Sequence, residues 1–323
     1  MSPNVHQVAI IGVGQLGRRH LQGLVKSSQA LSIHVVDPSE ASRRAVEDYI
    51  AAPDSGALPP IKVHASIDAL PPELALVVVA TTANQRLAVI EQLARVSKVT
   101  HLVLEKFLFN DSTQYAAAQG IIAVQGMRAW VNTPRRHFSV YRELREQMKN
   151  ERLLQFTADG GDWGLCCNSV HFVDLVQFLT GESELRQLST RIDDGALPSK
   201  REGYVELTGE VTGEVGSARF TVRSIRGSTK PITLTLHYES QTVFVSEAAG
   251  TSWRVGQGPV ETVGFRLPYQ SEMTGTIADQ LLLTGTCDLT PYAESTAAHL
   301  PLLHAFAKLA GEVTGSTAKC AIT

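Results

Sequence analysis

The stretch GVGQLG, residues 12–17, decides how the first part of this chain folds. It follows the apolar run VAII (residues 8–11), which predicts a buried strand, and it opens a segment with helical spacing. Three glycines at G-x-G-x-x-G spacing between a strand and a helix are typical of a dinucleotide-binding turn. We expect Gly12 to make the tight turn, Gly14 to let the backbone approach a pyrophosphate, and Gly17 to let helix and strand pack closely.

The helix that starts here supplies the rest of the predicted cofactor site. Gln15 and Leu16 lie in its first turn, where free N–H groups and the positive end of the helix dipole attract phosphate. Asp37 ends the next predicted strand, 20 residues after Gly17, where an acidic side chain accepts hydrogen bonds from the adenosine ribose. The alternative is an ordinary tight turn with a surface aspartate.

Asp37 also bears on the choice of cofactor. Its carboxylate should repel a 2′-phosphate, which favours NAD over NADP. Ser39, Arg43 and Arg44 follow directly and could neutralise such a phosphate, so NADP stays open. The two arginines could equally form a solvated helix face.

Strands and helices alternate up to about residue 125, which predicts an α/β fold with a doubly wound parallel sheet. Short alternating runs between about 185 and 268 predict a large antiparallel sheet, flanked by helices. We therefore expect a dinucleotide-binding Rossmann domain over residues 1–125. Residues 126–323 are expected to form an α+β substrate-binding and oligomerisation domain, with the last helix free to pack back on the first domain.

Bulk composition narrows the class of protein. The 323 residues carry a net charge of −3, so no broad basic surface for nucleic acid is expected. No apolar run reaches the roughly 18 residues that span a bilayer, and the N-terminus does not read as a signal peptide. The four cysteines lack CxxC spacing, so we expect a cytoplasmic protein without a metal site or disulfide framework.

Three further segments carry a family resemblance: HLVLEKF (101–107), which ends in Glu105-Lys106, ATTANQR (80–86), and a His171-x-x-Asp174 pair before Leu-Thr-Gly. With the glycine turn, they make the chain resemble the glucose–fructose oxidoreductase / inositol dehydrogenase (Gfo/Idh/MocA) family over its whole length. The resemblance implies an NAD(P)-dependent oxidoreductase that acts on hydroxyl groups of sugars, cyclitols or nucleotide-sugars. It also implies a homodimer or homotetramer built through the open sheet.

The resemblance assigns roles to particular residues. Thr81, Thr82 and Asn84 would pass the nicotinamide side of the cofactor, Glu105 would belong to the cofactor site, and Lys106 would lie near nicotinamide and substrate. The chain departs from the family at three places. Phe107 replaces a proline, Arg86 replaces a loop histidine, and Cys167 stands where many members have an aspartate four residues before the histidine.

The chemistry requires a base for the hydroxyl proton when hydride leaves the carbon. We favour His171 as proton shuttle and Lys106 as orienting and stabilising cation, although the two roles could be exchanged. Residues that could contact substrate share polar side chains near the domain junction or on the helix of His171: Asn132, Arg135, Arg136, Asn168 and Asp174. The two arginines could clamp an anionic substrate or form ordinary ion pairs.

Two other readings stay open. The departures at Phe107 and Cys167 fit a regulatory relative that binds the dinucleotide without turnover. A tightly held cofactor that shuttles hydride between two substrates is a third reading.

Overall fold

The structure, a computed structural model, describes residues 5–52, 57–193, 195, 197–198 and 205–314. The chain divides into two compact units. The first contains residues 1–109, 113–132 and 268–292, and the second contains the remainder. Among the described residues, no helix is long and apolar enough to cross a membrane.

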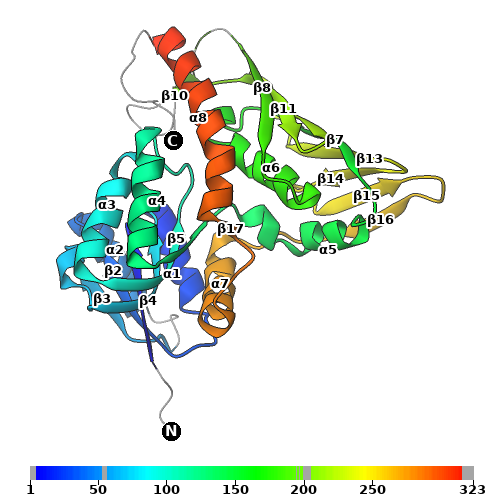
Figure 1. Cartoon of the computed structure of the whole chain (residues 1–323). Helices are drawn as coiled ribbons and strands as arrows, with labels where there is room; N and C mark the ends of the chain where they lie inside the picture. Colours follow the sequence, from blue (N-terminus) through cyan, green and yellow to red (C-terminus); the bar gives the residue numbers. More distant parts are fainter. Residues whose placement is uncertain (1–4, 53–56, 194, 196, 199–204, 315–323) are drawn as a thin grey trace. The chain divides into compact units, whose positions relative to one another are not determined.

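The first unit is the predicted Rossmann fold (Figure 1). Its sheet has the strand order β17-β6-β5-β4-β1-β2-β3, and all strands except the short β17 run parallel. The strands are β1 (His6–Ile11), β2 (Leu31–Val36), β3 (Ile61–His64), β4 (Glu73–Val79), β5 (Lys98–Leu104), β6 (Arg128–Val131) and β17 (Thr290–Pro291). The helices are α1 (Gln15–Leu24), α2 (Glu40–Ala51), η2 (Ile67–Ala69), α3 (Ala83–Val96), α4 (Thr113–Gln125) and α7 (Gln270–Thr284).

The order of the strands fixes where a ligand can bind. The chain winds outward from β1 to β3, then returns to β4 beside β1 and winds the other way. Right-handed crossovers therefore place α1 and α3 on opposite faces of the sheet. The loops after β1 and β4 diverge at this switch point, which is where doubly wound sheets bind ligands. Near-continuous burial of β2 and of most of β4 agrees with a sheet covered on both faces.

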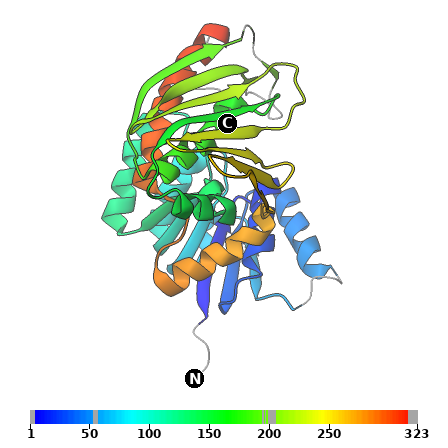
Figure 2. The same cartoon turned by 90° about the vertical axis from the view of Figure 1, so that its right-hand side faces the viewer.

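The second unit is built on a mostly antiparallel sheet of eight strands, in the order β16-β15-β14-β13-β7-β12-β11-β8, whose strands lie side by side in Figure 2. Only β7 and β12 pair in parallel. The strands are β7 (Leu153–Gly160), β8 (Leu185–Ile192), β11 (Gly209–Val215), β12 (Ala218–Ser224), β13 (Thr233–Tyr238), β14 (Thr242–Ser246), β15 (Thr251–Val255) and β16 (Glu261–Gly264), with β9 (Leu197–Pro198) and β10 (Val205–Glu206) as a separate pair. The helices are η3 (Pro134–His137), α5 (Ser139–Gln147), α6 (Leu165–Thr180) and α8 (Tyr292–Thr314), whose first residue belongs to the first unit.

Helix α6 covers one face of this sheet. It packs against β7, β11 and β12, and burial along β11 and β12 alternates residue by residue. This alternation is expected of a sheet with one face in the core and one open face. The α/β prediction with a parallel and an antiparallel sheet is therefore confirmed.

The division of the chain differs in detail from the predicted boundary at residue 125. Strand β6 lies beyond that boundary and completes the first sheet beside β5. Helix α7 also belongs to the first unit, where it packs against α1. Its Gly275 comes so close to α1 that an added Cβ would lie 2.7 Å from the carbonyl oxygen of Gly23. That the last helix packs back on the first domain stays a prediction.

Candidate functional site

The glycine turn has the geometry of a phosphate-binding loop. Gly12 adopts a φ of +87°, and a Cβ there would lie 2.9 Å from the Thr81 side chain. A Cβ on Gly17 would lie 1.9 Å from the carbonyl oxygen of Gly12, so helix and turn pack too closely for any side chain. A Cβ on Gly14, by contrast, meets nothing within 4 Å. The open space lies directly before the first turn of α1, where free N–H groups can receive a phosphate.

Asp37 holds this turn in place. Its Oδ2 accepts a hydrogen bond of 2.8 Å from the N–H of Val13, and its Oδ1 accepts one of 2.8 Å from the N–H of Ser39. Asp37 and the glycine turn line a cavity of about 460 Å³. The cavity also includes Ile11, Val36, Pro38, Ala65, Ser66, Ile67, Ala80, Thr81, Thr82, Gln85, Val89 and Gln92.

The two arginines after Asp37 have different surroundings. Arg43 Nη1 donates to the carbonyl oxygens of Asp37 and Pro38, both at 2.8 Å, so its guanidinium lies at the end of β2. Arg44 forms an exposed ion pair of 2.5 Å with Glu40, one helical turn away. Arg44 therefore matches the alternative of a solvated helix face.

The loop after β4 contributes the opposite wall of the cavity. Thr81 and Thr82 line it, and the buried Oγ1 of Thr81 has no hydrogen-bond partner among the described residues. Gln85, which the sequence did not single out, also lines the cavity. Asn84 is exposed, as are Gln15 and Leu16 in the first turn of α1, and none of the three lines the cavity.

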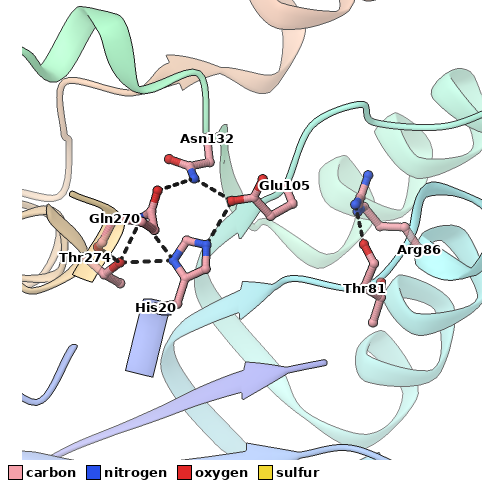
Figure 3. A network of polar contacts seen from close by, with 7 residues as sticks. All are labelled: His20, Thr81, Arg86, Glu105, Asn132, Gln270 and Thr274. Carbon is pink, nitrogen blue, oxygen red and sulfur yellow. Dashed lines mark hydrogen bonds and ion pairs between the residues drawn. The ribbon is translucent and has the colours of Figure 1, made fainter. Parts of the chain in front are cut away.

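Glu105 and Asn132 come together in a buried polar network within the first unit (Figure 3). The Glu105 carboxylate accepts hydrogen bonds from His20 Nε2 at 2.8 Å and from Asn132 Nδ2 at 2.5 Å. Asn132 Nδ2 also donates to Gln270 at 2.9 Å, and His20 Nδ1 lies 3.0 Å from the hydroxyl of Thr274. Glu105 thus points into the protein rather than into the cavity, and a direct contact with cofactor stays a prediction.

The network keeps the Glu105 carboxylate charged. Burial by itself raises the pKa of this carboxyl, but the hydrogen bonds from His20 and Asn132 and the nearby charges, including that of Arg86, outweigh burial and lower it. Lys106 follows directly and is half-buried, and its peptide bond to Phe107 is cis. Phe107 itself is buried.

In the second unit, α6 presents His171 together with Asn168 and Cys167. Asn168 Nδ2 donates to the carbonyl oxygen of Trp163 at 2.7 Å. The thiol of Cys167 donates to Glu206 Oε1 at 3.3 Å. Cys167 and His171 are four residues apart and share a helix face, with Cβ atoms about 5–6 Å apart. Glu206 on β10 therefore brings a carboxylate to the position where the sequence lacks one, and sequence spacing alone gave no sign of it.

The predicted substrate arginines are engaged within the second unit. Arg135 forms a two-pronged ion pair with Glu247, at 2.9 and 2.8 Å, and its guanidinium stacks over the ring of Phe172. Arg136 pairs with the buried carboxylate of Asp174 at 2.9 Å and with Glu294 at 2.8 Å. A substrate anion would have to displace these carboxylates, so a substrate role for Arg135, Arg136 and Asp174 stays an untested prediction. No group of three or more potential metal ligands occurs in the part of the chain that the structure describes.

Comparison with known proteins agrees with this geometry. The model of the Gfo/Idh/MocA family, described as an oxidoreductase family with an NAD-binding Rossmann fold, matches residues 6–133. No curated protein matches the chain significantly.

Several solved structures share the fold over nearly the whole chain. UDP-N-acetylglucosamine 3-dehydrogenase GnnA from Acidithiobacillus ferrooxidans is 15% identical, with a TM-score of 0.73 over 94% of this chain and 97% of its own. The transcriptional regulator Gal80p from Kluyveromyces lactis is 14% identical, with a TM-score of 0.73 over 95% and 92%. A point mutant of KijD10, a 3-ketoreductase from Actinomadura kijaniata in complex with TDP-benzene and NADP, is 15% identical, with a TM-score of 0.69 over 94% and 96%.

Proposed function

Because residues 6–133 form an NAD-binding Rossmann domain of the Gfo/Idh/MocA oxidoreductase family, we propose that this chain is an NAD(P)-dependent dehydrogenase or reductase. Its substrate would be a sugar, cyclitol or nucleotide-sugar, with hydride moving between nicotinamide and a hydroxyl or keto carbon. Nucleotide-sugars are the first class to test, because GnnA is named for one and KijD10 was solved with a TDP ligand. The observation that carries the proposal is the cavity between the glycine turn, Asp37 and Thr81.

The residues of the first unit fit a dinucleotide. The space beside Gly14 and the first turn of α1 would hold the pyrophosphate, and Asp37 would accept hydrogen bonds from the adenosine ribose. The buried hydroxyl of Thr81 would gain a partner from the bound molecule. Bound NAD supplies the hydride acceptor for the oxidation of an alcohol carbon.

The remaining chemistry belongs to side chains of the protein. In the proposed mechanism, the imidazole of His171 takes the proton of the substrate hydroxyl, and the Lys106 ammonium stabilises the oxygen as negative charge develops on it. The Glu206 carboxylate on β10 accepts the hydrogen bond of the Cys167 thiol, one helical turn before His171, and would supply negative charge beside that face of α6. In the direction of reduction, the same imidazole would return the proton to the oxygen.

A panel of sugars and nucleotide-sugars, followed by NADH absorbance, tests the proposal. Once a substrate is found, Lys106→Met should lower kcat about a thousandfold and leave NADH affinity within about twofold. Lys98→Met is the matched control, since Lys98 is exposed at the other end of the same strand. Full turnover by Lys106→Met would remove Lys106 from the mechanism.

A second candidate function is regulation, in which the chain binds the dinucleotide and does not turn over. The fold shared with the transcriptional regulator Gal80p favours it. NADH binding with no turnover of any sugar in the panel would support this reading over the first.

We also propose that the chain forms a homodimer or homotetramer through the open face of its second sheet. Large apolar side chains are exposed there, including Phe244 at 39%, Val255 at 40% and Val260 at 58%. With Trp253 they line a hollow of about 440 Å³. Contiguous exposed apolar surface of this kind marks protein–protein contacts. Light scattering should give a multiple of the 35.0 kDa chain mass and a lower mass for Phe244→Lys.

A further inference from the structure

The turn that carries Lys106 is held from both sides within the first unit. On one side, Glu105 is fixed by its hydrogen bonds from His20 and Asn132. On the other side, the carbonyl oxygens of Phe107 and Leu108 both accept from Arg86 Nη1, at 2.5 and 2.6 Å. Lys106 therefore lies between two anchored neighbours.

Arg86 also reaches the loop after β4. Its Nη2 donates to the carbonyl oxygen of Thr81, the residue whose side chain lines the cavity (Figure 3). Arg86 lies in the first half of α3 and is only 2% exposed. A single guanidinium thus ties the loop after β4 to the loop after β5.

The chemistry of the guanidinium explains why an arginine occupies this position. A buried cation needs both acceptors and a balancing charge. The three carbonyl oxygens provide acceptors, and the Glu105 carboxylate lies near enough for Arg86 to lower the pKa of that carboxyl. A guanidinium carries five donors in a planar fork and can serve three carbonyls at once, whereas a lysine ammonium cannot match this geometry.

The position of these loops indicates which half of a dinucleotide they affect. In the proposed function, Asp37 at the end of β2 would mark the adenosine side. The second nucleotide then lies across the switch point, towards the loops after β4 and β5. We propose that Arg86 is a positioning residue, which fixes Thr81 and the Lys106 turn so that they form the nicotinamide half of the site. This inference rests on the proposed function for its ligand.

The test compares two ligands that differ in the nicotinamide. NADH and ADP-ribose are titrated into the full chain by calorimetry. We expect Arg86→Ala to weaken NADH about tenfold and to change ADP-ribose less than about twofold. Arg86→Lys, which keeps the buried charge, should give a smaller loss for NADH in the same direction. Arg95→Ala, on an exposed arginine of the same helix, should change neither affinity.

The outcomes separate the inference from its alternatives. Equal losses of affinity for NADH and ADP-ribose would show that Arg86 only stabilises the fold and would overturn the inference. Unchanged NADH affinity in both Arg86→Lys and Arg86→Ala would overturn it as well. If Arg86→Ala fails to fold, the change in NADH affinity relative to ADP-ribose affinity in Arg86→Lys decides whether the inference holds. Selective loss of NADH binding supports the inference even if no sugar is turned over, an outcome that would count against the proposed enzyme function alone. Absence of binding of either ligand to the unmodified chain would overturn the cofactor site itself.

Discussion

The first unit contains a stacked pair of histidines, His34 and His64, of which His34 is buried, whereas the second contains a buried arginine, Arg136, held between two carboxylates. In the first unit, His34 Nε2 donates to Gln7 at 2.9 Å, and its Nδ1 lies 3.0 Å from Nε2 of His64. In the second, Arg136 joins Asp174 and Glu294. Neutral imidazoles hold such contacts only while they stay neutral, but a guanidinium keeps its charge at any ordinary pH. The two clusters should therefore lose their contribution to stability under different conditions.

The largest effect is expected where an ion pair of the second unit is broken. Asp174→Ala removes the buried carboxylate partner of the Arg136 guanidinium and leaves it the ion pair with Glu294, whose side chain is 30% exposed. Removing one partner of a buried pair costs about 3–5 kcal/mol, because the other charge stays behind. We expect a drop of about 3 kcal/mol in the free energy of unfolding, measured with urea at neutral pH.

A matched control is Glu184→Ala, since Glu184 is exposed in the same unit. If Asp174→Ala unfolds no more easily than this control and instead raises KM for a substrate, Asp174 belongs to the substrate site after all. That result would break the comparison between the units.

Lowering the pH should destabilise the first unit because His34 is held neutral in the folded chain. Burial, with the nearby charges of His64 and Lys62, lowers the pKa of His34 from 6.5 to about 4. Between these values the unfolded chain binds a proton that the folded chain does not, so the free energy of unfolding falls as pH drops from 6.5 towards 4. The contribution of this one group is about 2–3 kcal/mol across the window.

Urea unfolding at several pH values between neutrality and pH 4 measures this slope. His34→Gln should flatten it, whereas His237→Gln, at an exposed position of the second unit, should not. The pKa of His64 and of His101 is also lowered by burial, so part of the slope should persist in His34→Gln. An unchanged slope would mean that His34 is not held neutral by the fold.

Features that depend on backbone geometry were the easiest to predict from the sequence. Gly12 and Gly17 are needed for packing that no side chain allows, so their spacing in the sequence identifies the turn directly. The parallel sheet could be predicted for a similar reason, because buried strands such as β4 are apolar along most of their length. The short strand β6 was missed because four residues carry too little periodicity.

The roles of side chains that could either contact a ligand or stabilise the fold were harder to predict. For Arg135 and Arg136 the sequence left a substrate clamp and ordinary ion pairs both open, because their carboxylate partners lie 38 or more residues away in sequence. Glu206 lies 39 residues from Cys167 and follows no motif. Such pairs depend on tertiary packing, which charge spacing in a single sequence does not encode.

The next effect concerns ligand binding in the first unit. Asp37→Ala removes the acceptor expected for the adenosine ribose and also the contact with the Val13 N–H. We expect NADH affinity to fall about tenfold to thirtyfold, and NADPH to lose less, because the repulsion of its 2′-phosphate disappears with the carboxylate. Fluorescence titration with both cofactors measures the change. Asp48→Ala, at an exposed position on α2, is the control. Equal losses for NADH and NADPH would mean that Asp37 only braces the glycine turn.

The smallest effect is expected at an exposed ion pair of the second unit. Arg152 and Glu239 meet at 2.9 Å, but their side chains are 59% and 51% exposed, compared with 13% and 14% for Arg135 and Glu247. Water already solvates the exposed charges and salt screens them, so Arg152→Ala should lower the free energy of unfolding by less than about 0.5 kcal/mol. Adding 1 M salt should remove most of even this difference, since the screening length is then about 3 Å. A cost for Arg152→Ala that approaches the cost for Asp174→Ala would mean that ion pairs stabilise this unit wherever they occur, and that burial is not what separates strong pairs from weak ones.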